Sequence, residues 1–146
     1  MEIKGMVLPQ SFVRFANQIQ PLSRCCHIDL IEKVDSFGNV LDTNLGMVFC
    51  DEATIVKETE NLSLNFAPDG FYGSDLDAKE PGAISDIVCF DEIICFGISA
   101  DDAPFCFDFR EDKNSPSIIW WDDVYWRKIS NSFDDFLRLF NRDNKQ

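Results

Sequence analysis

Residues 105–109 read Phe105-Cys106-Phe107-Asp108-Phe109, and the rest of the chain is organised around this stretch. Large apolar residues alternate here with small or polar ones, which is the period-two pattern of a half-buried β-strand. We therefore expect the three phenylalanines on one face of a sheet and Cys106 and Asp108 on the other.

Two further strands are predicted next to this stretch. Residues 93–98 form an apolar run of strand length, and residues 117–121 are rich in β-branched and aromatic side chains. The segment 99–104 reads Ser-Ala-Asp-Asp-Ala-Pro, a composition typical of a hairpin loop. These three strands are the centre of the predicted sheet.

The segment 132–140 predicts a helix that closes the fold. One face of this helix would carry apolar residues at i, i+3, i+4 and i+7, namely Phe133, Phe136, Leu137 and Phe140. Ser132 and Asp135 resemble a capping box in which aspartate replaces the usual glutamate. We expect the apolar face to anchor the helix onto the sheet.

The N-terminal half contains weaker signals of the same kinds. Pro9 opens a helix that ends before Pro21, and short strands are predicted at 26–30 and 45–50, with a turn at 36–39. Asp51 is a suitable N-cap for a helix running to about Leu62. Residues 65–85 have no clear periodicity and are predicted to form a long acidic loop.

Length and composition favour a single domain spanning residues 1–146. A chain of 146 residues that is 45% hydrophobic can bury a core without covalent cross-links. The N-terminus lacks the charged and apolar regions of a signal peptide, and no apolar run approaches the roughly 20 residues that span a bilayer. A cytoplasmic protein is therefore expected.

The six cysteines are expected to be reduced thiols without a metal. Cys50, Cys89, Cys95 and Cys106 lie in apolar runs, where cysteine behaves as a small hydrophobic residue. The adjacent pair at 25–26 lacks the C-x-x-C spacing with which two sulfurs converge on one ion.

The net charge of −13 restricts the class of partner. Nucleic acids and anionic membranes require a basic surface, so neither is expected to bind. A basic protein partner is compatible with the charge, because a surface field of one sign speeds encounter with the opposite sign. The same charge could also serve solubility alone.

No catalytic constellation is apparent. The single histidine, His27, has no partner pattern, and the chain lacks Gly-rich phosphate loops and hydrolase motifs. Adjacent acidic residues point to opposite faces in a strand and are usually solvated in a loop, so no metal or cofactor is expected. Asp108, if buried, must accept hydrogen bonds or pair with a cation such as Arg110 or Arg127.

The order of these segments resembles the SUKH superfamily (Smi/Knr-like proteins). The first matching pieces are a Leu-Pro and aromatic helix at residues 8–15, a strand–helix unit at 46–62 and an apolar hairpin ending in Phe-Asp at 94–109. They are followed by an aromatic strand and Asp at 118–122 and by a Ser-Phe-x-x-Phe-Leu helix at 132–137. The chain departs from the family pattern at residues 20–22, where Gln-Pro-Leu replaces the common Asn-Gly, and in having only seven residues before Leu8 rather than a helix.

The resemblance implies an α+β fold with a curved, mainly antiparallel sheet and helices packed beside it. It also implies a function in protein binding. Many bacterial members of the superfamily look like immunity proteins that neutralise a polymorphic toxin, whereas fungal members regulate cell-wall synthesis and signalling.

The sequence thus predicts a non-enzymatic immunity protein that covers a basic toxin site; the alternatives are a regulatory or scaffold module and, third, a hydrolase. Trp120 and Trp121 alternate in direction, so one is expected in the core while the other could be exposed in an interface. The alternative is that the four aromatic residues of this segment all cover the core, namely Trp120, Trp121, Tyr125 and Trp126. The residues predicted to bind the partner lie in or beside the sheet loops: Asp101, Asp102, Glu111, Asp112, Asp122, Asp123 and Trp121.

Overall fold

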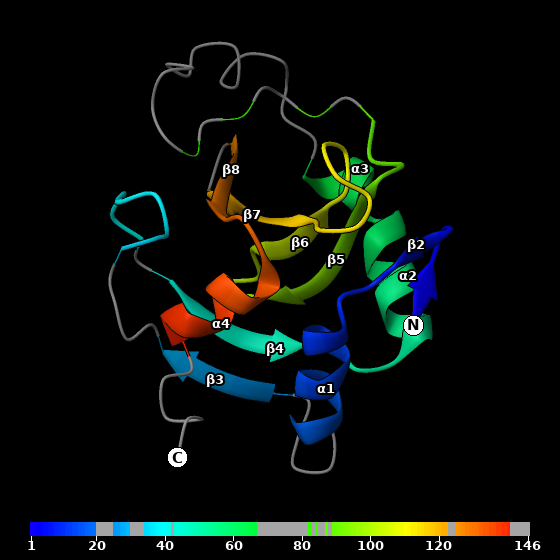
Figure 1. Ribbon diagram of the computed structural model, residues 1–146, viewed down its shortest axis with the longest axis horizontal. Helices are drawn as coiled ribbons and strands as arrows, with labels where there is room; N and C mark the ends of the chain where they lie inside the picture. Colours follow the sequence, from blue (N-terminus) through cyan, green and yellow to red (C-terminus); the bar gives the residue numbers. More distant parts are fainter. Residues whose placement is uncertain are drawn as a thin grey trace.

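A computed structural model describes residues 1–19, 25–29, 34–41, 43–66, 82, 84, 87, 89–122 and 125–140 of the chain. The fold is α+β, with helices packed beside a curved six-stranded antiparallel sheet and a separate two-stranded hairpin near the N-terminus (Figure 1). In the large sheet each strand pairs with its neighbour along the chain, in the order β3-β4-β5-β6-β7-β8. The predicted fold class is confirmed.

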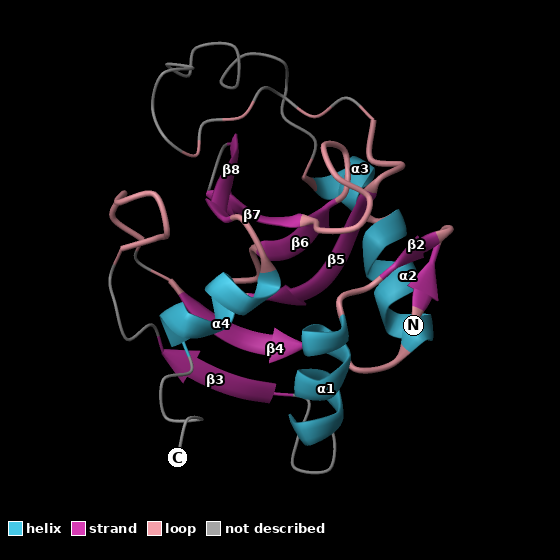
Figure 2. Ribbon diagram, in the orientation of Figure 1, coloured by secondary structure: helices cyan, strands magenta, loops and turns pink. Residues whose placement is uncertain are grey.

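The helices and strands follow the predicted segments closely (Figure 2). The strands of the large sheet are β3 (Cys25–Asp29), β4 (Asn44–Val48), β5 (Ile93–Ile98), β6 (Pro104–Asp108), β7 (Ser117–Asp122) and β8 (Tyr125–Ser130). The helices are α1 (Gln10–Ile19), α2 (Glu52–Glu60), α3 (Leu62–Asn65) and α4 (Phe133–Phe140). The acidic loop predicted at 65–85 lies mostly outside the described residues.

Two elements go beyond the predicted strands. β8 extends the sheet by pairing with β7, with Trp126 opposite Trp121. Near the N-terminus, β1 (Glu2–Ile3) pairs with β2 (Met6–Val7) through a two-residue turn. Lys4 and Gly5 in that turn have φ angles of 54° and 82°, as a tight hairpin turn requires.

A bulge in β5 organises the centre of the sheet. The pairing with β6 passes from Cys95–Cys106 to Gly97–Phe105, so Phe96 is an extra residue on β5. Because Phe96 follows Cys95, its ring lies on the opposite face from Cys95 and Cys106, together with Phe107, with 4.5 Å between the ring centroids of Phe96 and Phe107. Gly97 beside the bulge is required by space, because a Cβ there would lie 2.6 Å from the carbonyl oxygen of Met47.

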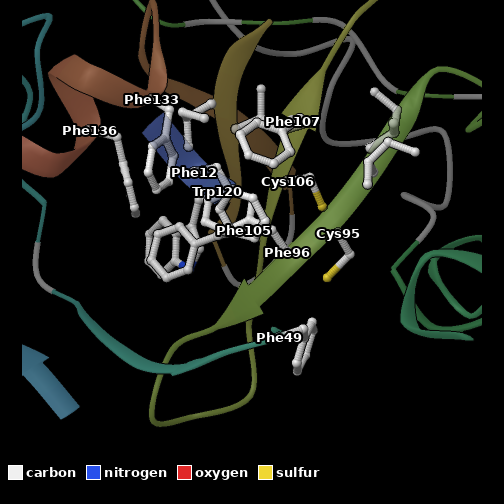
Figure 3. Close-up of a cluster of buried hydrophobic side chains, with 14 of the residues drawn as sticks. Phe12, Phe49, Cys95, Phe96, Phe105, Cys106, Phe107, Trp120, Phe133 and Phe136 are labelled. Atoms are coloured by element: carbon white, nitrogen blue, oxygen red, sulfur yellow. The ribbon is translucent and has the colours of Figure 1, made fainter. Parts of the chain in front are cut away.

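The phenylalanines on this face join the sheet to two helices (Figure 3). Phe12 of α1 lies 5.6 Å from Phe96, and Phe133 of α4 lies 5.4 Å from Phe12, between ring centroids. Phe136 also contacts Phe96, at 5.6 Å. Most of these contacts are edge-to-face, a favourable arrangement of aromatic rings. Helices α1 and α4 therefore cover one face of the sheet, and their phenylalanines form a single aromatic core with those of the strands.

The prediction of a half-buried central strand is wrong. Cys106 and Asp108, which face away from the phenylalanines, are only 0% and 5% exposed. Helix α2 packs along β5 beyond the end of β4, where the Thr59 hydroxyl accepts a 2.9 Å hydrogen bond from the Cys95 amide. Both faces of the central strands are thus covered, and the period-two pattern records side-chain size rather than solvent exposure.

The helix ends explain where the predicted helices differ from the observed ones. Asp51 caps α2 as predicted, accepting a 2.9 Å hydrogen bond from the Thr54 amide. The helix predicted to run to about Leu62 ends at Glu60 with Asn61 as its C-cap, and α3 begins at Leu62. In α4, the Ser132 hydroxyl accepts from the Asp135 amide at 3.1 Å, which confirms the cap.

The buried face of α4 differs by one residue from the predicted face. Phe133 and Phe136 are buried as predicted. Leu137, predicted on the buried face, is half-buried, and Leu139 is buried instead. The side chain of Phe140 lies outside the described residues. None of the helices that the structure describes is long and apolar enough to cross a membrane.

We predict that Phe136→Ala lowers the free energy of unfolding by roughly 3–5 kcal/mol, because it opens a cavity between α4 and the sheet. Urea denaturation measures this loss. Leu137→Ala in the same helix is the control, and we expect about 1 kcal/mol because its side chain is half-buried. A loss below about 1 kcal/mol for Phe136→Ala would show that α4 is not anchored by the aromatic core.

Candidate functional site

The two ends of the large sheet carry different loops. Successive antiparallel hairpins leave from alternate ends, so the loop 99–103 lies at the same end as the β7–β8 turn. The turn 34–40 is held at that end by β8, and we call residues 34–40, 99–103, 121–122 and 125–127 the acidic end. The opposite end comprises residues 2–7, 90–92 and 109–116, and we call it the mixed-charge end (Figure 1).

The structure divides the residues predicted to bind a partner between these two ends. Asp101, Asp102 and Asp122 lie at the acidic end, whereas Glu111 and Asp112 lie in the loop at the mixed-charge end. Asp123 lies outside the described residues. The predicted set is therefore not one contiguous patch.

Asp101 and Asp102 are exposed but held by a tightly bonded loop. The Ser99 hydroxyl donates to the Asp101 carboxylate and accepts a 3.1 Å hydrogen bond from the Ala103 amide. Asp102 has a φ of 69°, a left-handed conformation that aspartate tolerates better than most residues. The Ala100 amide donates to Asn44 at 2.9 Å, which fastens the loop to the start of β4. Both carboxylates are presented to solvent on a fixed backbone.

Asp122 belongs to an ion-pair cluster centred on Arg127. The Arg127 guanidinium donates to Asp122 at 2.9 Å and to Asp35 at 2.6 Å. It also donates to the carbonyl oxygen of Val40 at 3.1 Å. The Asp35 side chain is 0% exposed and that of Arg127 is 12% exposed. Burial lowers the pKa of Arg127, but the hydrogen bonds to Asp35 and Asp122 outweigh it and the pKa is raised, so the guanidinium stays charged.

Asp35 itself fixes the turn 34–40. One of its carboxylate oxygens accepts from the amides of Phe37 and Asn39 at 2.9 Å and 3.0 Å, while the other accepts from Arg127. The turn therefore receives its shape from Asp35 and its position from Arg127. Neither residue was among the predicted partner-binding residues; the signal available in the sequence is the Asp-x-Phe-Gly-Asn turn itself, where aspartate bonds to backbone amides further along.

The acidic residues at the mixed-charge end have local partners. Glu111 pairs with Lys128 at 3.3 Å, and Asp112 accepts from the Asn114 amide at 2.9 Å. Lys113 pairs with Glu92. Exposed carboxylates in this region thus alternate with lysine and arginine, and the local field is weaker than at the acidic end.

Asp108 meets its predicted partner. Its two carboxylate oxygens accept from the Arg110 guanidinium at 2.9 Å and 2.8 Å, a bidentate pair. The hydrogen bond to Asp108 raises the pKa of Arg110, against the opposing effect of burial. This pair satisfies a buried carboxylate and has a structural role. Arg127, the other candidate cation, is committed to Asp35 and Asp122.

The tryptophans of β7 point to opposite faces as predicted. Trp120 is buried against Phe105, with 5.9 Å between ring centroids. Trp121 is half-buried and contacts Trp126 and Phe66 at 5.4 Å and 6.0 Å. The part of Trp121 that is exposed lies on the face opposite to Trp120, so it is available to a partner only from that face.

Two shallow hollows flank the loop at the mixed-charge end. One, of about 370 Å³, is lined by Lys4, Val7, Glu92 and Lys113 among others. The other, of about 310 Å³, includes Ser11, Arg14, Ser132 and Asp134. The second lining contains three serines and Asp134, but the Ser132 hydroxyl caps α4, and among the described residues no hydrogen bond joins any of these serines to a carboxylate that could activate it. Within the described residues, no three histidine, cysteine or acidic side chains converge as metal ligands would.

The described cysteines are placed mostly as the sequence indicates. Cys50, Cys95 and Cys106 are buried, whereas Cys89 is exposed, contrary to its apolar setting in the sequence. Burial and a hydrogen bond with Cys95 raise the pKa of the Cys106 thiol well above its usual value. This thiol is therefore poorly reactive. The side chains at 25–27, including His27, lie outside the described residues.

Comparison with known protein families gives a match that covers most of the chain. The profile described as SMI1 / KNR4 family (SUKH-1) matches residues 2–139. Neither the curated proteins nor the solved structures contain a significant match to the chain.

We predict that Arg127→Met lowers the free energy of unfolding by roughly 3–5 kcal/mol, because it leaves the buried Asp35 carboxylate without its cation. Arg138→Met is the control: it removes an ion pair to Asp135 whose arginine side chain is 74% exposed, and such a surface pair contributes at most about 1 kcal/mol. Chemical denaturation of both variants measures the difference.

A double variant separates lost charge from lost packing. Asp35→Asn combined with Arg127→Met should recover part of the stability, since an amide oxygen can still accept from the turn amides without a buried charge. Equal losses for Arg127→Met and Arg138→Met would show that the cluster does not hold the turn.

Proposed function

Because this chain belongs to the SMI1/KNR4 family (SUKH-1), we propose that it is an immunity protein, which binds a cognate toxin and covers the toxin's active or substrate-binding site. Membership confirms the resemblance carried by the sequence motifs. It supports a role in protein binding of the immunity or Smi/Knr type, and proteins of this family are generally non-catalytic.

The observation that carries the proposal is the charge of the acidic end. Asp101 and Asp102 are exposed there and Asp122 is half-buried, while the only arginine or lysine among the described residues of this end is Arg127, which is neutralised by two carboxylates. Such a surface attracts a basic protein and repels acidic ones. A toxin that acts on nucleic acid has a basic substrate site, which is the complementary surface.

The mechanism we propose is occlusion. The acidic end would lie over the basic substrate site of the toxin, so that carboxylates replace the phosphates that the toxin normally contacts. Asp123, adjacent in sequence to Asp122, would extend this surface. Glu111 and Asp112 lie at the other end and would contribute only to the long-range field. The rigid loop 99–103 favours fast association, because no rearrangement precedes contact.

The alternative is a regulatory or scaffold module of the Smi/Knr type without a toxin partner. It shares the family and the fold, so the gene neighbourhood is the discriminating observation. A toxin-like gene immediately upstream favours immunity. A hydrolase is the third possibility. It is disfavoured because, among the described residues, neither hollow at the mixed-charge end holds a serine bonded to a base that could activate it.

We also propose that residues 1–146 form one domain that works in the cytoplasm with reduced cysteines, without metal or cofactor, and with a protein rather than nucleic acid or membrane as partner. The family profile, which runs from residue 2 to residue 139, supports the single domain. The net charge of −13 supports the choice of partner.

We predict that Asp101→Lys with Asp102→Asn slows association with the toxin about tenfold at low salt and flattens its salt dependence, because steering acts over a Debye length of about 8 Å at physiological ionic strength. Asparagine is chosen for position 102 because it tolerates the left-handed backbone. Stopped-flow or surface-based kinetics at two salt concentrations measure the rate.

The matched control is Glu111→Lys with Asp112→Asn, which changes the net charge equally at the mixed-charge end. It should slow association less than the first pair. Equal effects of the two pairs would mean that the net charge, not the acidic end, directs encounter. No binding of wild-type protein to the upstream gene product would favour the regulatory alternative.

We predict that Trp121→Ala speeds dissociation of the complex, because a half-buried aromatic anchor holds the partner after encounter. The association rate should change little, since no charge is altered. The free energy of unfolding must be measured in parallel, because Trp121 also contacts Trp126. An unchanged dissociation rate would restrict Trp121 to a packing role.

A further inference from the structure

Two valines stand side by side on the surface of the acidic end. Val34 and Val40 form an antiparallel bridge on either side of the turn that Asp35 shapes. Directly opposed residues in such a pair project to the same side, with Cβ atoms about 5 Å apart. Val40 is 76% exposed and Val34 is 36% exposed, so the pair forms a small apolar surface.

The backbone beneath these valines is unusually well attached for a surface turn. The Ser36 amide donates to the Ile129 carbonyl oxygen at 3.0 Å, and Arg127 donates to the Val40 carbonyl oxygen at 3.1 Å. The buried Asp35–Arg127 ion pair is a third connection between the turn and β8. The turn is therefore held in one position by interactions that leave its two valines facing solvent.

Folding of this chain does not account for apolar side chains at these positions. A β-branched residue suits an extended backbone, but threonine would satisfy that preference equally and would be better solvated. An exposed valine adds little to stability, because the hydrophobic effect scales with the area removed from water. Apolar side chains at both positions gain a benefit only when a partner covers them.

Carboxylates lie at the same end of the sheet as the pair. Asp122 and the carbonyl oxygen of Val40 both accept hydrogen bonds from the Arg127 guanidinium, so Asp122 lies close to Val40. The loop containing Asp101 and Asp102 is bonded to Asn44, four residues after Val40, where the turn ends. A small apolar centre with a charged rim is the arrangement found in protein interfaces.

We propose that the turn 34–40 is the apolar anchor of the toxin interface, with Val34 and Val40 inserted into an apolar depression that is flanked by lysine and arginine on the toxin. This inference rests on the proposed function and adds to it the contact that determines the lifetime of the complex. Asp101, Asp102 and Asp122 steer the encounter, whereas the valines slow dissociation. Because the turn is already fixed, little conformational freedom is lost on binding.

The test measures binding of the full chain to the product of the gene immediately upstream, produced with its catalytic residues inactivated. Val34→Thr with Val40→Thr keeps the size and branching of both side chains and removes only their apolar character. We expect the dissociation rate and the Kd to rise about tenfold, with an unchanged association rate. The free energy of unfolding should stay within about 0.5 kcal/mol of wild type.

The matched control is Val7→Thr, because Val7 is also an exposed strand valine, at 65%, but lies at the mixed-charge end. It should leave the dissociation rate unchanged. A Kd for the double variant within twofold of wild type, or an equal loss for Val7→Thr, would overturn the assignment of the turn while leaving the proposed function in place. Absence of binding by the wild-type protein would overturn both.

Discussion

The structure depends on the aromatic core that joins the large sheet to α1 and α4. Phe96 is central to this core, since its ring contacts Phe107 within the sheet and both Phe12 and Phe136 from the helices. Alternation from Cys95 directs Phe96 to this face, and the bulge then places Gly97 opposite Phe105. Glycine is needed at position 97, because a Cβ there would lie 2.6 Å from the carbonyl oxygen of Met47.

Arg127 has a comparable role at the acidic end. It is the cation shared by Asp35 and Asp122, so one side chain both positions the turn 34–40 and pairs with two carboxylates, which leaves the cluster with one net negative charge. Buried ion pairs often contribute little net stability, because desolvation opposes their attraction. Their value here lies in geometry. The guanidinium fixes a surface element relative to β8, so under our proposal the acidic end binds its partner without a change of shape.

The division of acidic residues between two ends bears directly on function. At the mixed-charge end, lysine and arginine side chains form ion pairs with the carboxylates. The surface there has no strong preference for a partner of positive or negative charge. At the acidic end, Asp101 and Asp102 have no cationic neighbour among the described residues. The family supports protein binding. The contrast between the ends is the reason why we propose the acidic end as the site for a basic partner.

The sequence by itself determined the elements that depend on local geometry. The alternation in 105–109, the apolar face of α4 and the caps Asp51 and Ser132 follow from backbone periodicity and hydrogen bonding within a few residues. Only the tertiary structure decided which carboxylate Arg127 binds, because Asp35 is 92 positions away and Asp108, which the sequence left open, is nearer. The cover over β5 on the second face also depends on α2, which lies far from β5 along the chain. Local patterns predict direction and spacing of side chains, whereas long-range packing decides what each of them meets.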